Sequence, residues 1–110
     1  MATLTTKQLS QTALTGTTTT TLYTTPAATK TIVKEILLCN TDSVPRTVTI
    51  QMGASPATGV LSRILSVVSL QAGETKVFAG STVLETTHLI TGGASSAAVV
   101  SCTISGVEVV

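Results

Sequence analysis

His88 is the side chain in this sequence best suited to acid–base chemistry, because an unperturbed imidazole changes charge near neutral pH. It is the only histidine among the 110 residues. Glu85 lies three positions earlier, but in a strand that spacing places the two side chains on opposite faces. A hydrolase needs a nucleophile, a base and an orienting group held together. Since one histidine and five scattered carboxylates offer no such set, the sequence predicts that the protein is not an enzyme.

The remaining polar residues predict no metal site and no cofactor site. Asn40 and Asp42 could contribute oxygen ligands, but calcium takes six or more, and a turn explains both residues better. Gly92 and Gly93 form a loop pair without the helix that should follow a phosphate-binding loop. We therefore expect no metal ligands and no cofactors.

Cys39 and Cys102 are the only cysteines. Each lies in an apolar strand pattern, where a thiol behaves as a small hydrophobic group, so both are expected in the core. The first residues lack the apolar stretch of a signal peptide, which predicts synthesis in a cytoplasm, where disulfides are disfavoured. Whether the two cysteines lie close together stays open.

The low charge of the chain argues against two classes of partner. The six basic residues are scattered singly and the net charge is +1, so the basic stripe of a nucleic-acid-binding protein is missing. The longest apolar block, Ile36–Cys39, is far too short to span a bilayer. We expect no nucleic-acid partner and no membrane partner.

The elements that must position these side chains are strands. Threonine and other β-branched residues dominate, only 2% of residues are aromatic, and turn formers recur at roughly ten-residue spacing. Strands are expected over Thr19–Thr25, Thr31–Asn40, Arg46–Gly53, Ser66–Leu70, Thr75–Ala79, Thr82–Leu84, His88–Thr91 and Ala97–Val110. The pattern predicts an all-β fold, a single antiparallel β-sandwich or jelly roll of about seven or eight strands over residues 19–110.

Three segments carry more specific expectations. Thr31–Asn40 is apolar on both faces, so it is either central in the sandwich or buried against a partner; Ile32, Ile36 and Leu38 are expected on one face and Val33, Leu37 and Cys39 on the other. Arg46–Gly53 alternates, which predicts a half-exposed strand with a threonine-coated outer face. After Gly106 the apolar positions change parity, which predicts a β-bulge that bends the last strand.

Residues 1–18 are expected to form an extended N-terminal arm. Leu4, Leu9 and Leu14 recur every five residues, a spacing that fits neither the helical nor the strand period. A docking arm, a disordered tail and a first strand are all open alternatives. Together with Tyr23, one of two aromatic residues, these leucines are the candidate partner-binding residues.

The composition also indicates association with another chain. The core must be aliphatic and thin, and the mean hydropathy of +0.52 is high for a small soluble monomer. A partner that binds only the folded state would stabilise it by mass action.

Five segments are informative through their order: Thr20–Pro26, Lys30–Thr41, Thr47–Ile50, Leu70–Thr75 and Val99–Val109. They resemble small β-sandwich virion proteins of tailed bacteriophages, which include head decoration (cement) and accessory tail proteins. In that group a Leu-Tyr-Thr-x-Pro strand precedes an apolar strand ending in Asn-Thr, and the last strand contains Ser-Gly-Val-Glu. The resemblance leaves the N-terminal arm uncovered.

The resemblance implies a capsid decoration protein without catalytic residues. Such a protein would bind the assembled major capsid protein as a homo-oligomer, a dimer or trimer, and stabilise the head against internal pressure. It would be synthesised in the host cytoplasm and reside on the head surface of the virion. The alternative is a tail-tip or fibre module that binds a host receptor or glycan, although glycan binding normally uses more exposed aromatic residues.

Overall fold

Eight β-strands are present in the computed structural model of the protein, which describes residues 3–54 and 63–110. The strands are Leu4–Ala13 (β1), Thr21–Thr24 (β2), Lys30–Asn40 (β3), Arg46–Gly53 (β4), Arg63–Leu70 (β5), Thr75–Leu84 (β6), Leu89–Ala94 (β7) and Val100–Val109 (β8). The stretch from Leu61 to Val68 also fits a helical spacing; its described part belongs to β5, while Leu61 lies outside the described residues. The two short strands expected after residue 74 are one continuous strand, β6.

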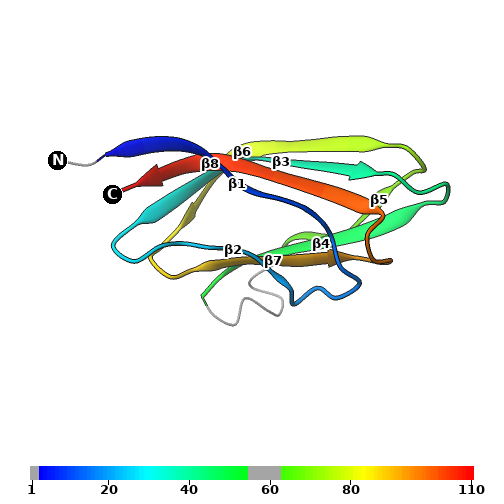
Figure 1. The fold of residues 1–110 in the computed structure, drawn as a ribbon, viewed down its shortest axis with the longest axis horizontal. Coiled ribbons are helices and arrows are strands. Elements are labelled where there is room, and N and C mark those ends of the chain that lie inside the picture. Colours follow the sequence, from blue (N-terminus) through cyan, green and yellow to red (C-terminus); the bar gives the residue numbers. More distant parts are fainter. Residues whose placement is uncertain (1–2, 55–62) are drawn as a thin grey trace.

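The strands form two four-stranded antiparallel sheets, in the orders β1-β8-β3-β6 and β2-β7-β4-β5. Figure 1 shows the sheets as two stacked layers, with both chain ends at the same end of the molecule. Only the β4–β5 connection stays within one sheet, and every other connection crosses to the opposite sheet. This is the jelly-roll arrangement, so the predicted fold class is confirmed.

An aliphatic core fills the space between the two sheets. Every strand contributes to it, and the side chains that are fully buried include Leu14, Leu38, Ile50, Leu70, Leu84, Ile90 and Ile104. Phe78 is only partly buried against this cluster. The thin aliphatic core expected from the composition is therefore what the sandwich has.

The N-terminal segment differs from the expected arm, because most of it is a strand of the sandwich. β1 pairs along its whole length with β8, from Leu4 opposite Val109 to Ala13 opposite Ser101. Leu14 then continues the pairing: its amide donates to the Val100 carbonyl at 2.8 Å. Among the three alternatives, the first strand describes the structure, since the free edge of β8 gives this segment a hydrogen-bonding partner within its own chain.

The chain between β1 and β2 crosses the outer face of the second sheet. The Gln51 side-chain amide donates to the Thr18 carbonyl at 3.3 Å, and the Ala94 amide donates to the Thr15 carbonyl at 2.9 Å. Thr49 and Gln51, expected on an exposed face of β4, are therefore buried. The prediction of a half-exposed strand was wrong because a connecting segment covers it.

Gly92 and Gly93 lie in β7 rather than in a flexible loop. A Cβ added to Gly93 would lie 1.9 Å from the carbonyl oxygen of Thr17, and one added to Gly92 would lie 2.7 Å from that of Thr49. Both glycines are needed because main chain approaches β7 closely from both sides. Sequence alone does not distinguish this role from loop flexibility.

The bulge predicted in the last strand lies on its two neighbours instead. The register of β3 shifts between Val33 and Glu35, and that of β1 shifts between Gln8 and Ser10, while β8 runs through Gly106 without a shift. The extra residue in β3 reverses the side-chain parity after it. Ile32 consequently faces outward with Leu37, not with Ile36 and Leu38 as predicted.

Candidate interaction surface

The four candidate partner-binding residues occupy two different environments. Leu9, Leu14 and Tyr23 are buried within the protomer, so they are not available to a partner in this structure. All three belong to the core of the sandwich, because β1 and β2 pack against that core. Leu4 is 69% exposed, at the start of the edge strand β1.

Tyr23 belongs to a polar cluster between the two sheets. Its hydroxyl donates to Glu108 Oε2 at 2.5 Å and lies 2.9 Å from the hydroxyl of Thr31, while Lys7 Nζ lies 3.4 Å from Glu108 Oε2. Burial, followed by the hydrogen bond to Glu108, raises the pKa of Tyr23 to about 12. The phenol is therefore a neutral hydrogen-bond donor that ties β2 to β8, rather than an exposed ring for binding.

The Tyr23–Glu108 contact also joins two of the motifs on which the resemblance rests. The Leu-Tyr-Thr segment is β2, and the Ser-Gly-Val-Glu segment is the end of β8. Their side chains are 85 residues apart in sequence and meet in one hydrogen bond. These motifs are thus structural in this fold.

Asn40, at the end of the apolar strand β3, has a structural role as well. Its side chain is fully buried, and its Oδ1 accepts a hydrogen bond from the Asp42 amide at 3.0 Å. Its Nδ2 lies within hydrogen-bonding distance of the carbonyl oxygens of Val44, Leu70 and Gln71. Asn40 therefore holds the turn after β3 against the end of β5, as the turn interpretation of Asn40 and Asp42 predicted.

The groups with catalytic potential do not gather into a site in the described part of the chain. No three His, Cys, Asp or Glu residues among residues 3–54 and 63–110 lie close enough to hold a metal ion. His88 and Glu85 belong to the turn before β7, where the His88 amide donates to the Glu85 carbonyl at 3.0 Å. No helix in the described ranges is long and apolar enough to cross a membrane.

The two cysteines are free and face opposite sides of the first sheet. Cys102 is fully buried in the core, and burial raises the pKa of its thiol to about 12. Cys39 lies opposite Ser101, the neighbour of Cys102, so its side chain points outward and is only half-buried. The expectation that both cysteines lie in the core was correct for Cys102 and wrong for Cys39, because of the parity change in β3.

The outer face of the first sheet carries several apolar side chains. The sequence indicated them only through the strand over residues 31–40, which is apolar on both faces. Val77 and Val83 on the edge strand β6 are 53% and 54% exposed. Each lies directly opposite an outward residue of β3: Val83 pairs with Ile32, and Val77 pairs with Leu37. Val107 of β8 lies on the other side of Ile32. We call these five residues the outer apolar face.

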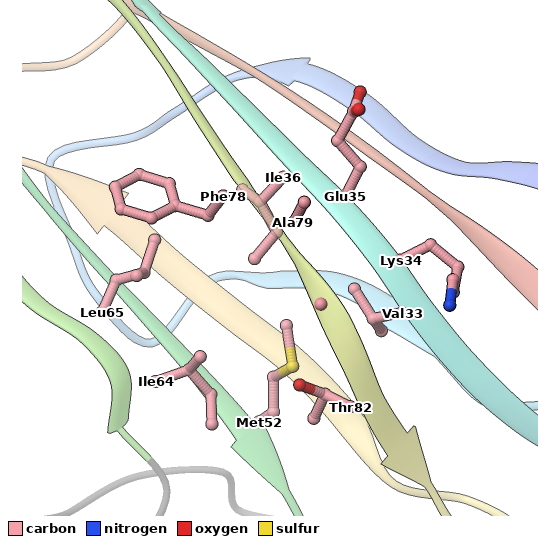
Figure 2. A pocket seen from close by; sticks show the side chains of 11 residues that line it. Val33, Lys34, Glu35, Ile36, Met52, Ile64, Leu65, Phe78, Ala79 and Thr82 are labelled. Carbon is pink, nitrogen blue, oxygen red and sulfur yellow. The ribbon is translucent and has the colours of Figure 1, made fainter.

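A small cavity opens between the sheets at the β5 and β6 edges. Figure 2 shows Met52, Leu65 and Phe78 around it, whereas Lys34 and Glu35 extend away from it. Its volume is about 90 Å³, well below the roughly 300–1,000 Å³ of pockets for small organic ligands. The cavity can take one aliphatic side chain at most, so it is not a cofactor site.

Comparisons with known proteins find similarity in structure rather than in sequence. No protein-family model matches the chain, and no curated protein matches it. A chain of the acid-stable capsid structure of Helicobacter pylori bacteriophage KHP30 superposes with a TM-score of 0.54 and 11% identity. That match covers 100% of this chain and 94% of the phage chain.

Chains from infectious bursal disease virus share the fold as well. The Gx strain gives a TM-score of 0.52 at 14% identity, and a crystallised viral particle gives 0.52 at 11% identity. Each match covers 99% of this chain, but only 32% and 30% of the viral chains, so this chain spans about a third of their length. The fold of this protein is therefore a jelly roll that is also found in chains of virus capsids.

Proposed function

We propose that this chain is a decoration (cement) protein of a tailed-phage head, which binds the assembled major capsid protein as a homo-oligomer and stabilises the shell. The observation that carries the proposal is the match to the phage KHP30 capsid structure, in which a chain of almost the same extent has this fold. Since the identity is 11%, the match supports the fold, and the role is our inference from it.

The extent of the phage match supports a role on a phage head. The match covers 100% of this chain and 94% of the phage chain, so the likeness extends over the whole jelly roll. The bursal disease virus chains are matched over only about a third of their length.

The surface chemistry fits close packing on a shell. Only 10% of residues are charged, so contact with another protein desolvates few charges, each of which would cost several kcal/mol unless paired. An apolar outer face offers surface that association would bury. A host-cytoplasm synthesis and a head-surface location belong to the same proposal.

Leu4 and the free edge of β1 are the proposed contact with the major capsid protein. Among residues 3–54 and 63–110, β1 pairs only with β8, so its other edge presents backbone groups that have no partner strand in the described part of the chain. The contact with a partner that was expected of a docking arm is therefore proposed for the edge strand β1. Leu9 and Leu14 act indirectly here, since their burial fixes the position of β1. Tyr23 lies on β2, in the other sheet, and is not part of this edge.

Copy number per virion tests the proposal, measured by quantitative mass spectrometry of purified particles of the source phage. A count equal to that of the major capsid protein, or a simple fraction of it, is expected. A few copies per particle would instead favour the tail-tip or fibre module, and absence from particles would refute both functions. Cosedimentation with shells assembled from the major capsid protein then tests the edge: Leu4→Lys should weaken binding, and Val44→Lys, on an exposed turn after β3, should not.

A further inference from the structure

We infer that the outer apolar face of the first sheet is a two-fold interface between two copies of this chain. The inference extends the proposed function, in which the protein acts as a homo-oligomer, by naming the surface and the symmetry. It rests on how apolar and charged side chains are distributed along β3 and β6.

The outward residues in the middle of β3, from Ile32 to Leu37, are symmetric about its centre. Lys34 and Glu35 lie side by side at the register shift, and both extend away from the core (Figure 2). Ile32 precedes this charged pair and Leu37 follows it, each separated from it by one residue. The strand therefore presents an apolar residue, two opposite charges and a second apolar residue.

The edge strand β6 repeats the symmetry beside it. Val83 lies opposite Ile32 and Val77 lies opposite Leu37, so Gly80 is at the midpoint. Ser81, the neighbour of Gly80, accepts a hydrogen bond from Lys34 there at 2.8 Å.

This distribution is self-complementary under one rotation. The rotation is about a two-fold axis that lies in the plane of the face, runs perpendicular to the strands and passes the level of Lys34 and Glu35. This rotation stacks β3 on β3 of the second copy, and β6 on β6 of the second copy. Ile32 then meets Leu37 of the second copy, and Val83 meets Val77 of the second copy.

The same rotation places opposite charges together. Lys34 of one copy faces Glu35 of the other, twice across the axis, as an isologous interface requires. Lys34 is exposed, and its Nζ donates to the hydroxyl of Ser81 at 2.8 Å, so the ammonium keeps further N–H groups for a carboxylate of a second copy. A second copy supplies the complementary charges and apolar residues by symmetry. The surface of a shell would need an unrelated set of residues with the same arrangement.

The whole outer side of the first sheet, of which the outer apolar face is a part, is large enough for a specific dimer. Four strands about 4.8 Å apart, each about ten residues long at ~3.3 Å per residue, form a face of roughly 630 Å². Two copies would bury about 1,250 Å², at the lower end of the ~1,200–2,000 Å² typical of specific complexes. The hydrogen-bonding edge of β1 stays outside this stacking.

Sedimentation velocity and light scattering on the purified chain test the inference without any shell. The expected mass is twice the 11.1 kDa of one chain. Lys34→Glu and Glu35→Lys each create like-charge contacts across the axis and should each raise the dimer dissociation constant at least about tenfold. The double variant Lys34→Glu/Glu35→Lys exchanges the charges and should restore dimerisation towards the wild-type value.

Val83→Lys should dissociate the dimer, while Val44→Lys, matched in chemistry but away from the face, should not. Circular dichroism of each variant is the control for folding. A monomeric wild type, a trimer, a dimer insensitive to the face variants, or no recovery in the double variant would overturn the inference. A monomer that still binds shells would refute the dimer alone, and a dimer absent from particles would refute only the proposed function.

Discussion

Replacing Leu14 by Ala tests whether the N-terminal segment is part of the sandwich. The Leu14 side chain is 0% exposed, and its main chain bonds to Val100 and Ala98 on either side of the β8 start. The substitution removes three carbons at about 0.8 kcal/mol each. The cavity left behind adds to that loss, and buried Leu→Ala changes cost about 2.7–5.0 kcal/mol. We expect a loss of about 3 kcal/mol in the free energy of unfolding.

Urea unfolding at a fixed protein concentration measures this loss, and thermal melting should show a decrease in Tm of about 12 °C for a chain of this size. The matched control is Leu4→Ala, a change of the same chemistry at a 69% exposed position of the same segment. It should change the free energy of unfolding by less than about 0.5 kcal/mol. Equal, small effects of both substitutions would refute the assignment of residues 4–14 to the sandwich and would favour a detached arm.

Two further predictions address the close approach at β7 and the polar cluster. Gly93→Ala places a methyl group against the Thr17 carbonyl and should lower the free energy of unfolding by about 2 kcal/mol or more. The control, Gly80→Ala, should be nearly neutral because its Cβ would meet no atom within 4 Å. Equal urea midpoints for the two variants would contradict the close approach at Gly93. Tyr23→Phe removes the hydrogen bond to Glu108 and should cost about 1.5–3 kcal/mol at pH 7. Since the pKa of Tyr23 is raised from 10.0 to about 12 in the folded state, the advantage of the wild type is fully present below pH 10 and should shrink as the pH rises from 10 to 12. A stability difference independent of pH across that window would show that Tyr23 is not buried as described.

Sequence patterns predicted the fold class because strand and turn chemistry is local. Alternating or two-faced apolar runs and recurrent turn formers lie within ten residues of one another, so a sandwich and the strands β2 to β8 could be predicted, with β6 expected as two shorter strands. β1 was only one of three alternatives for the N-terminal segment. Asn40 and Asp42 were correctly placed in a turn for the same reason.

The errors arose where the decisive contact lies far away in the chain. Gly93 was predicted in a loop because only the Thr17 main chain, 76 residues earlier, shows why a Cβ is excluded. Ile32 was placed on the wrong face because one extra residue in β3 reverses the parity, and no local pattern marks it. Leu9 and Leu14 did not fit the strand period because a register shift and the end of β1 lie between them.

The candidate surface was only partly visible in the sequence. The two-faced pattern of residues 31–40 predicted either a central strand or a partner, and β3 is a central strand, between β8 and β6. Val77 and Val83 were predicted in two separate short strands, Thr75–Ala79 and Thr82–Leu84. Their alignment with Ile32 and Leu37 exists only after β3 and β6 pair.

The position of β8 has a consequence for how the chain acquires its structure. β8 lies between β1 and β3, although it follows every other strand in the sequence. During synthesis, the first sheet therefore lacks an inner member until residues 100–109 have emerged from the ribosome. Folds dominated by such distant pairings close slowly, in milliseconds to seconds, and their unpaired apolar strands are prone to aggregation in the meantime. The nascent chain thus depends on completing β8 before it encounters other chains, and slow production at low temperature should increase the soluble yield.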